Sequence, residues 1–115
     1  MWSVVATDEY LEWFENQESK AKSDILASVL LLKEFGPHLG RPYADTLKGS
    51  AIKNLKELRV KSYRHVYRVA YYFDEKRNAL LLTAGDKRGK NEKQFYKRLI
   101  SNAERLITKY QIEEE

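Results

Sequence analysis

Apolar residues at two different spacings divide this 115-residue chain into helical and extended segments. Residues 2–6 are mainly β-branched and aromatic, which is typical of a short strand. Thr7-Asp8 then predicts the start of a helix, because a threonine hydroxyl caps the first turn and carboxylates are favoured at its positive end. Apolar positions at helical spacing predict a second helix over Ser19–Phe35, which Gly36-Pro37 ends. The first third of the chain is therefore expected to form one strand and a helical hairpin.

Strict alternation of polar and apolar residues replaces the helical spacing in the middle of the chain. Residues 54–61 alternate between apolar Leu58 on one side and polar Arg59 on the other, as a half-buried strand does. Lys61-Ser62 is predicted to form a tight turn, and residues 63–74 then form a longer alternating stretch. Two adjacent antiparallel strands are expected here.

The remaining segments complete the expected topology. Glycine and proline predict a loop over 38–50, and a polar turn separates the long strand from a third strand over 79–84. Residues 85–91 are too basic and glycine-rich to be packed and are expected to form a loop. Apolar residues three and four positions apart predict a last helix over 92–110. The expected order is β-α-α-β-β-β-α: an α+β fold in one domain over residues 1–115, with a small, mainly antiparallel sheet, an N-terminal helical hairpin and a C-terminal helix.

The composition excludes several classes of protein. The chain is 43% hydrophobic and 33% charged, so it can bury a core and is not expected to be disordered. No window approaches the roughly 18 apolar residues of a membrane-spanning helix. The absence of cysteine removes disulfides, thiolate ligands and thiol nucleophiles, and the two histidines, His38 and His65, give little support to a zinc centre. We therefore expect a soluble, cytoplasmic protein with no membrane segment, metal ion or cofactor.

Charge is unevenly distributed along the chain. Residues 1–40 hold 3 Lys and Arg against 7 Asp and Glu, a net −4, whereas residues 41–110 hold 18 against 7, a net +11. Three terminal glutamates then bring the whole chain to +4. Such a basic half indicates a polyanionic partner, most commonly nucleic acid. A solvated, lysine-rich surface is the simpler alternative.

Arginines gather on one side of the expected sheet. Arg59 on one strand and Arg64 and Arg68 on the next share a face if the alternation holds across the turn. The planar guanidinium group suits phosphate and keeps its charge at neutral pH. Three arginines on one face repel one another unless an anion lies among them. Either a bound phosphate or the neighbouring Glu57 is expected to be that anion.

Weaker signals lie outside the arginine face. The glycine-rich loop before the last helix carries Lys87, Arg88 and Lys90 without the spacing of a P-loop, so it is either part of a basic groove or a solvated turn. Tyr96 lies about 100° around the last helix from its apolar stripe and either faces that groove or is an inert surface residue. His65 shares a face with apolar residues, which favours a buried or edge histidine over a catalytic one.

Three segments together resemble one family. Residues 57–68 (ELRVKSYRHVYR) resemble the central signature of the RelE/ParE toxin superfamily. Leu47-Lys48-Gly49 is similar to the LKG that precedes that signature. Residues 84–90 (AGDKRGK), followed by a helix, resemble its HigB-like, phage-related branch. The expected element order is also that of the superfamily, so the resemblance covers nearly the whole chain.

This resemblance implies a type II toxin of the mRNA interferase kind. Such a protein is a metal-independent endoribonuclease that cleaves mRNA on the ribosome and so inhibits translation. In these enzymes the 2′-hydroxyl attacks the adjacent phosphate, and basic residues replace the histidine pair of other ribonucleases. No cofactor is implied.

The resemblance also implies the site residues. The implied catalytic residues are Arg59, Arg64, Lys87, Tyr96 and Glu57. The cations expected to bind RNA are Lys48, Lys53, Lys56, Arg68, Arg88, Lys90 and Lys93. RelE has a lysine, its candidate base, at the position of Glu57. Either Glu57 takes that role here, or the role moves to Lys56 or elsewhere.

Two other functions remain open. A ParE-like toxin binds DNA gyrase and cleaves nothing, and the fold alone does not separate it from a nuclease. The arginine face and the loop cations favour the nuclease, because a gyrase inhibitor has no scissile phosphate to neutralise. A non-toxic, phage-derived accessory protein that binds nucleic acid is the third possibility.

The resemblance further implies a cognate antitoxin, which would be HigA-like and would carry a helix-turn-helix DNA-binding domain. The basic half should attract an acidic antitoxin segment, because opposite charges steer encounter. Two docking places are expected. One is the arginine face, where acidic side chains would mimic phosphates. The other is the acidic helix pair over residues 7–35, which is remote from the groove. HigB-like systems often leave the active site uncovered, which favours the helix pair.

Overall fold

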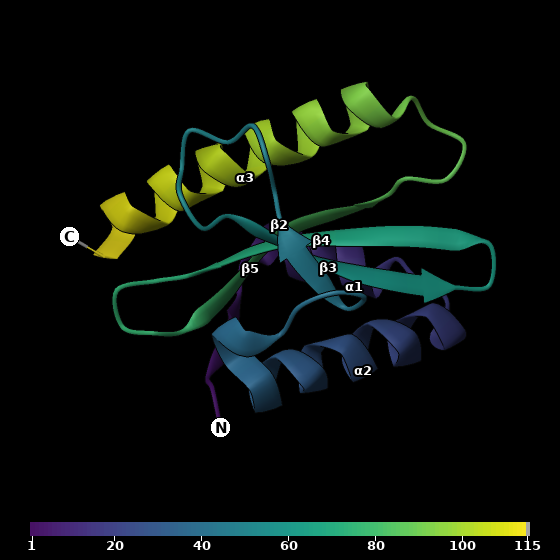
Figure 1. Ribbon diagram of the computed structural model, residues 1–115, viewed down its shortest axis with the longest axis horizontal. Coiled ribbons are helices and arrows are strands. Elements are labelled where there is room, and N and C mark those ends of the chain that lie inside the picture. Colours follow the sequence, from purple (N-terminus) through teal and green to yellow (C-terminus); the bar gives the residue numbers. More distant parts are fainter. Residues whose placement is uncertain (115) are drawn as a thin grey trace.

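The protein forms a five-stranded sheet with helices on both faces (Figure 1). The structure is a computed structural model and describes residues 1–114, with side chains up to residue 111. The elements are β1 (Val4–Ala6), α1 (Asp8–Glu15), α2 (Ser19–Phe35), the 3₁₀ turn η1 (Gly36–His38), β2 (Ala44–Thr46), β3 (Lys56–Ser62), β4 (His65–Phe73), β5 (Ala79–Asp86) and α3 (Glu92–Glu114). The strands lie in the order β1-β5-β4-β3-β2. β1 runs parallel to β5, and all other neighbours are antiparallel. The predicted α+β class is confirmed.

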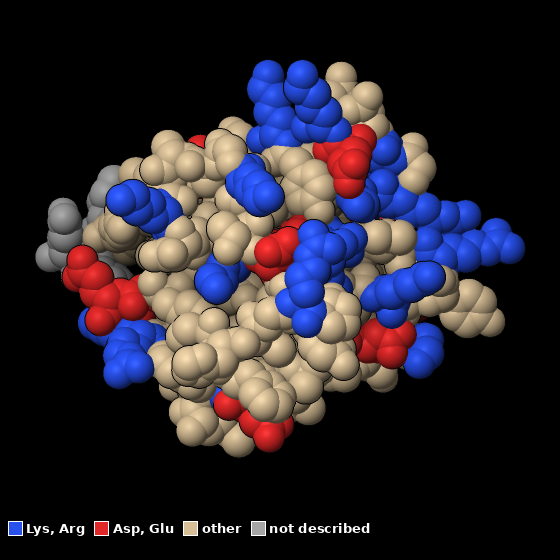
Figure 2. All heavy atoms as spheres, in the orientation of Figure 1, with Lys and Arg blue, Asp and Glu red and all other residues tan. Residues whose placement is uncertain are grey.

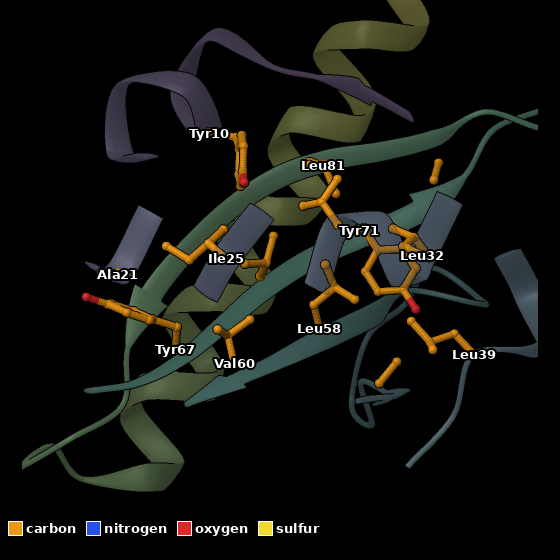
Figure 3. Packing of buried hydrophobic residues seen from close by; sticks show 14 residues of the cluster. Tyr10, Ala21, Ile25, Leu32, Leu39, Leu58, Val60, Tyr67, Tyr71 and Leu81 are labelled. Atoms are coloured by element: carbon orange, nitrogen blue, oxygen red, sulfur yellow. The ribbon is translucent and has the colours of Figure 1, made fainter. Parts of the chain in front are cut away.

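Both faces of the sheet are buried, which explains why β4 is almost continuously apolar. On one face, α1 and α2 pack against β3, β4 and β5 through side chains such as Ile25, Leu58 and Tyr71 (Figure 3). On the other face, α3 packs against β4 and β5 through side chains such as Leu82 and Leu106. Most side chains of the sheet are therefore apolar, and the buried Glu57 and Arg68 are exceptions.

The ends of the N-terminal helices follow from local chemistry. Thr7 caps α1: its hydroxyl accepts a hydrogen bond from the Tyr10 amide at 3.0 Å and donates one to the Leu82 carbonyl at 2.6 Å. The same residue thereby ties α1 to β5. α2 ends at Gly36, which has a φ of 54° and lies against the Trp2 indole, so a side chain there would collide with the ring. The predicted bounds of α2 are confirmed.

The β3–β4 hairpin turns two residues later than predicted. Ser62 pairs with His65, so the turn consists of Tyr63 and Arg64. Tyr63 adopts a φ of 59° without the glycine or asparagine that usually marks such a turn. Ser62 is buried and continues the ladder, whereas Tyr63 is 83% exposed. The predicted turn at Lys61-Ser62 is therefore wrong.

Two strand predictions also need correction. β2 lies within the segment predicted as a loop, where three residues are too few for alternation to be visible. β5 continues beyond the predicted end at Ala84, because Gly85 and Asp86 still pair with β4. Gly85 also lets α3 approach, since a Cβ at this position would lie 3.1 Å from the Phe95 ring.

α3 runs to Glu114, past the predicted end at Tyr110. It buries one side against the sheet and leaves the other exposed. Within residues 1–114, no helix has the length and apolar character needed to cross a membrane.

Candidate active site

A buried network of charged side chains lies on the α3-facing side of the sheet. Glu57 is at its centre and is only 4% exposed. Glu57 Oε2 accepts a hydrogen bond from Arg59 Nη1 at 2.9 Å, and Oε1 accepts one from the Tyr96 hydroxyl at 2.8 Å. Arg68 Nε lies 3.4 Å from Glu57 Oε1 and donates to the Tyr96 hydroxyl at 3.1 Å. We call these four residues the Glu57 cluster.

Strand register explains why this cluster forms. Arg59 and Arg68 lie directly opposite each other in the β3–β4 ladder, and like charges at such positions destabilise a sheet. Glu57 shares their face two residues from Arg59, so its carboxylate reaches both guanidinium groups. The anion expected among the arginines is therefore Glu57 itself.

Tyr96 connects α3 to the cluster, on the side that its helical position predicts. Burial and the hydrogen bond to Glu57 raise the pKa of the Tyr96 hydroxyl, although the bond from Arg68 opposes the shift. The phenol therefore stays neutral at physiological pH and donates a hydrogen bond to the carboxylate.

A cleft of about 360 Å³ opens beside the Glu57 cluster. The lining residues come from four parts of the chain: Arg41, Asp45, Thr46, Leu47 and Lys48 from β2 and its flanks, Glu57 and Arg59 from β3, Lys87 and Glu92 from the β5–α3 connection, and Tyr96 from α3. The side chains of Arg59 and Lys87 are each 22% exposed. Both cations are therefore accessible to a ligand in the cleft.

Two exposed carboxylates partly neutralise the cleft. Arg41 Nη2 lies 2.8 Å from Asp45 Oδ2, and Lys87 Nζ lies 2.9 Å from Glu92 Oε1. The hydrogen bond from Arg41 lowers the pKa of Asp45, and the bond from Lys87 lowers the pKa of Glu92. Exposed ion pairs contribute little stability, so a phosphate can displace these carboxylates more easily than it can displace Glu57.

No pattern in the sequence marks the part of the cleft contributed by β2. Arg41, Asp45 and Thr46 lie in a segment without periodicity, and only the pairing of β2 with β3 brings them to the cleft. Of the cations expected to bind RNA, Lys48 does line the cleft, and the LKG resemblance is the signal that marks it.

Arg64 does not belong to this cleft. It lies in the two-residue turn, so the alternation that would place it beside Arg68 is interrupted before β4 begins. Arg64 instead lines a pocket of about 240 Å³ together with Tyr63, His65 and Arg88. The prediction that three arginines share the sheet face is therefore wrong for Arg64.

The other predicted RNA-binding cations are spread over the surface. Lys53 and Lys93 are exposed, Lys56 is half-buried on the opposite face of β3 from Glu57, and none of the three lines the cleft. Lys90 lines a separate groove beside α3. Figure 2 shows Lys and Arg gathering at the end of the molecule that carries the β3–β4 hairpin and the β5–α3 loop.

His65 joins β4 to β5 and to the start of α2. Its Nδ1 lies 2.6 Å from Asp86 Oδ2, its Nε2 lies 3.3 Å from Glu18 Oε1, and its ring stacks on Tyr67. Hydrogen bonds to Asp86 and then to Glu18 raise the pKa of His65. Partial burial alone would raise the pKa of Asp86, but hydrogen bonds from the Val66 amide and from His65 outweigh it and lower this pKa. The predicted edge histidine is therefore a structural link.

We expect His65→Gln to weaken the dependence of stability on pH. Because the pKa of His65 is raised in the folded protein, its contribution is complete below the unfolded value of 6.5 and is lost as pH rises through the folded pKa. Between about pH 6 and about pH 8.5, the parent should therefore lose more thermal stability than the variant. Calorimetric melting temperatures at both pH values measure this difference. If both proteins lose the same thermal stability between these two pH values, protonation of His65 does not stabilise the fold.

Family membership is decided by a match over most of the chain. Residues 12–108, from within α1 to near the end of α3, match the model of the family described as "Phage derived protein Gp49-like (DUF891)". The chain belongs to this family. Two relatives of the Gp49-like chain are HigB2 and HigB3 of Mycobacterium tuberculosis, which their names assign as toxins and which are each 35% identical to it.

These comparisons differ in how much of each protein they cover. The likeness to HigB2 extends over 99 residues, 85% of this chain but 49% of HigB2, so the chain spans about half the length of that relative. The likeness to HigB3 extends over 94 residues, 82% of this chain and 80% of HigB3. A double arginine-to-alanine mutant of E. coli toxin RelE in the free state has a TM-score of 0.63, with 87% of this chain and 94% of RelE covered at 12% identity. That identity shows a shared fold alone. The resemblance to HigB-like proteins is confirmed by the two relatives, and the likeness to RelE confirms the expected fold.

Proposed function

We propose that this Gp49-like protein is the toxin of a type II toxin–antitoxin system and acts in the cytoplasm as a metal-independent mRNA endoribonuclease on the ribosome, which inhibits translation. The observation that carries this proposal is the cleft in which Arg59, Lys87 and Tyr96 meet beside the buried Glu57. The kinship with the HigB proteins and the RelE fold support it.

The proposed reaction needs no reactant other than RNA. The 2′-oxygen attacks the adjacent phosphorus while its proton passes to a base, and a pentacoordinate phosphorane forms. The bond to the 5′-oxygen then breaks, and that oxygen takes up a proton. The products are a 2′,3′-cyclic phosphate and a 5′-hydroxyl. Extra negative charge develops on the phosphoryl oxygens, so preorganised cations give the largest stabilisation.

Arg59 is the best placed of these cations. Glu57 holds one nitrogen of its guanidinium group, and part of the side chain is exposed to the cleft. This arrangement fixes the fork of donors before substrate arrives. Lys87 Nζ pairs with the exposed Glu92 and lies 5.8 Å from the Tyr96 ring centroid, so it can turn toward a phosphate near Tyr96.

Glu57 is foremost a positioning residue in this proposal, because its oxygens are occupied by Arg59, Arg68 and Tyr96. The contact with Tyr96 also offers a route for the proton. Tyr96 would accept the proton of the 2′-hydroxyl while passing its own to Glu57 Oε1. Lys56 lies on the opposite face of β3 and does not line the cleft, so it is not proposed as the base.

Induction of the gene in a bacterial host tests the proposed function. We expect growth arrest together with new mRNA 5′ ends located within coding sequence, mapped by primer extension. Arg59→Ala serves as the comparison variant for both readouts. Growth arrest with an SOS response and intact mRNA would instead support a ParE-like gyrase inhibitor, and no arrest would support the non-toxic accessory protein.

The antitoxin is proposed to be HigA-like and to dock on the helix pair over residues 7–35. On α2, Leu26 and Leu30 are 51% and 63% exposed and lie one turn apart, so they present apolar side chains on the same face. The α1–α2 pair is acidic, whereas the cleft is basic, so the two predicted docking places differ in charge and can be separated by mutation.

Replacing both Leu26 and Leu30 with serine is expected to weaken antitoxin binding by about tenfold for each side chain. The leucines are exposed in the free toxin, so the fold should not depend on them. Isothermal titration with the cognate antitoxin measures the affinity, and Arg59→Ala provides the comparison at the other docking place. If only Arg59→Ala weakens binding, the antitoxin covers the cleft instead.

A further inference from the structure

A second groove, of about 340 Å³, lies on the flank of α3 that faces away from the cleft. Gln94, Arg98 and Asn102 line it at intervals of four residues, which places them on one side of the helix. Tyr96, which lines the cleft, points to the opposite side. Residues 83–85 of β5 complete the groove.

The chemistry of this groove differs from that of the cleft. No carboxylate lines it, whereas Lys90 and Arg98 contribute two positive charges and Asn91, Gln94 and Asn102 contribute three amides. Within residues 1–111, the side chains of Gln94, Arg98 and Asn102 make no hydrogen bond or ion pair. A side-chain amide offers a donor and an acceptor, as the edges of nucleobases require, and a guanidinium group suits phosphate.

Apolar surface completes a cavity of nucleotide size. Phe95 and Leu99 line it, and Gly85 allows the Phe95 ring to lie close to β5. β1 ends opposite Leu81, so among the described strands β5 has a neighbour on one side only beyond this point. A volume of this size lies within the range of about 300–1,000 Å³ that is usual for small-ligand sites.

The β5–α3 loop connects the groove to the cleft. Lys87 lines the cleft, whereas Lys90 and Asn91 line the groove, and the Lys90 amide donates to the Lys87 carbonyl at 3.2 Å. α3 begins at Glu92, so the two cavities lie on either side of its first turns. An RNA strand with its scissile phosphate in the cleft therefore reaches the groove by crossing this loop.

We propose that the groove is a subsite for a nucleotide of single-stranded RNA that flanks the cleaved bond. Arg98 and Lys90 contact its phosphate, and the amides of Gln94 and Asn102 contact the edge of its base. RNA is favoured over an acidic peptide because the β5–α3 loop joins the groove to the cleft in which the scissile phosphate is proposed to lie. This inference rests on the proposed function, because it takes RNA as the substrate.

Oligonucleotides with 2′-O-methyl groups test the subsite without cleavage, because the attacking hydroxyl is blocked. The parent should bind a tetranucleotide more tightly than a dinucleotide. Arg98→Ala should lower the affinity for the tetranucleotide about tenfold. It should also reduce the slope of log affinity against log salt concentration by about 0.7–1. Lys97→Ala is the matched control: it makes the same charge change at the adjacent exposed position, which lines neither cavity, and should bind like the parent.

Gln94→Leu tests the contact with the base. In cells, the mapped mRNA 5′ ends should show a weaker base preference at one position beside the cleavage site, whereas Lys97→Ala should keep the parental preference. Unchanged oligonucleotide affinity in Arg98→Ala together with an unchanged preference in Gln94→Leu would overturn the proposal. Lower affinity of Arg98→Ala for an acidic octapeptide, but not for RNA, would assign the groove to a peptide. A parent that binds oligonucleotides through Arg98 but cleaves no mRNA would retain the subsite and refute the proposed function.

Discussion

Replacing Glu57 with alanine is expected to lower the free energy of unfolding by about 3–5 kcal/mol, because it leaves a buried charge without its partner. Arg68 is 6% exposed, and its Nε lies 3.4 Å from Glu57 Oε1. Without the carboxylate, Arg68 faces Arg59 directly across the β3–β4 ladder. Urea denaturation at neutral pH measures the loss.

Glu57→Gln is the matched variant, since it keeps the volume of the side chain and one oxygen, which can still accept from Tyr96 or from Arg59, whereas an amide nitrogen replaces the other acceptor. It should be more stable than Glu57→Ala and remain folded, so that its cleavage rate can be measured. A decrease of about 10²–10⁴ in that rate would support the proton route through Tyr96. A parental rate would restrict Glu57 to positioning. An alanine variant as stable as the parent would contradict the buried-charge argument.

Arg59→Ala is expected to reduce the rate of RNA cleavage about a hundredfold, equivalent to ~3 kcal/mol of transition-state stabilisation. The fold should survive, because Glu57 keeps Arg68 and Tyr96 as partners. Single-turnover cleavage of ribosome-bound mRNA at saturating protein separates the chemical step from binding. A parental rate in Arg59→Ala would remove this residue from the proposed mechanism.

Two companion variants sharpen the assignment of the site. Arg59→Lys keeps the charge but lacks the planar fork of donors, so its rate should fall between those of the parent and Arg59→Ala. Arg64→Ala tests the position that the family resemblance implies as catalytic and that the structure places in the hairpin turn. A decrease as large as that of Arg59→Ala would extend the active site to this turn.

Features that depend on neighbouring residues could be predicted from the sequence. The bounds of α2 follow from helical spacing and from Gly36-Pro37, and the cap of α1 follows from Thr7. Strand alternation also placed Glu57 and Arg59 on one face. The sequence does not predict the position of the hairpin turn, because Tyr63 adopts a positive φ without the usual sequence signal, and Arg64 is therefore expected on the sheet face although it lies in the turn.

Features that depend on distant residues could not be predicted in the same way. Helical spacing gave the direction of Tyr96, but its contact with Glu57 joins positions 39 residues apart and depends on how α3 lies on the sheet. Arg41 reaches the cleft only because β2 pairs with β3, and a three-residue strand leaves no periodic signal. The groove beside α3 depends on the pairing of β1 with β5, and no local pattern encodes which strand β1 pairs with.

The cleft takes its lining from β2, β3, the β5–α3 connection and α3, so no short segment of the chain contains it. Lys87 and Tyr96 belong to the last third to be synthesised, and α3 must cover the apolar surface around Leu82 before Tyr96 can reach Glu57. Contacts between positions so far apart in the chain are slow to form during folding. A product whose translation stops before α3 would therefore be harmless to the cell that makes it, and the proposed nuclease would become active only after its own message has been read through that helix.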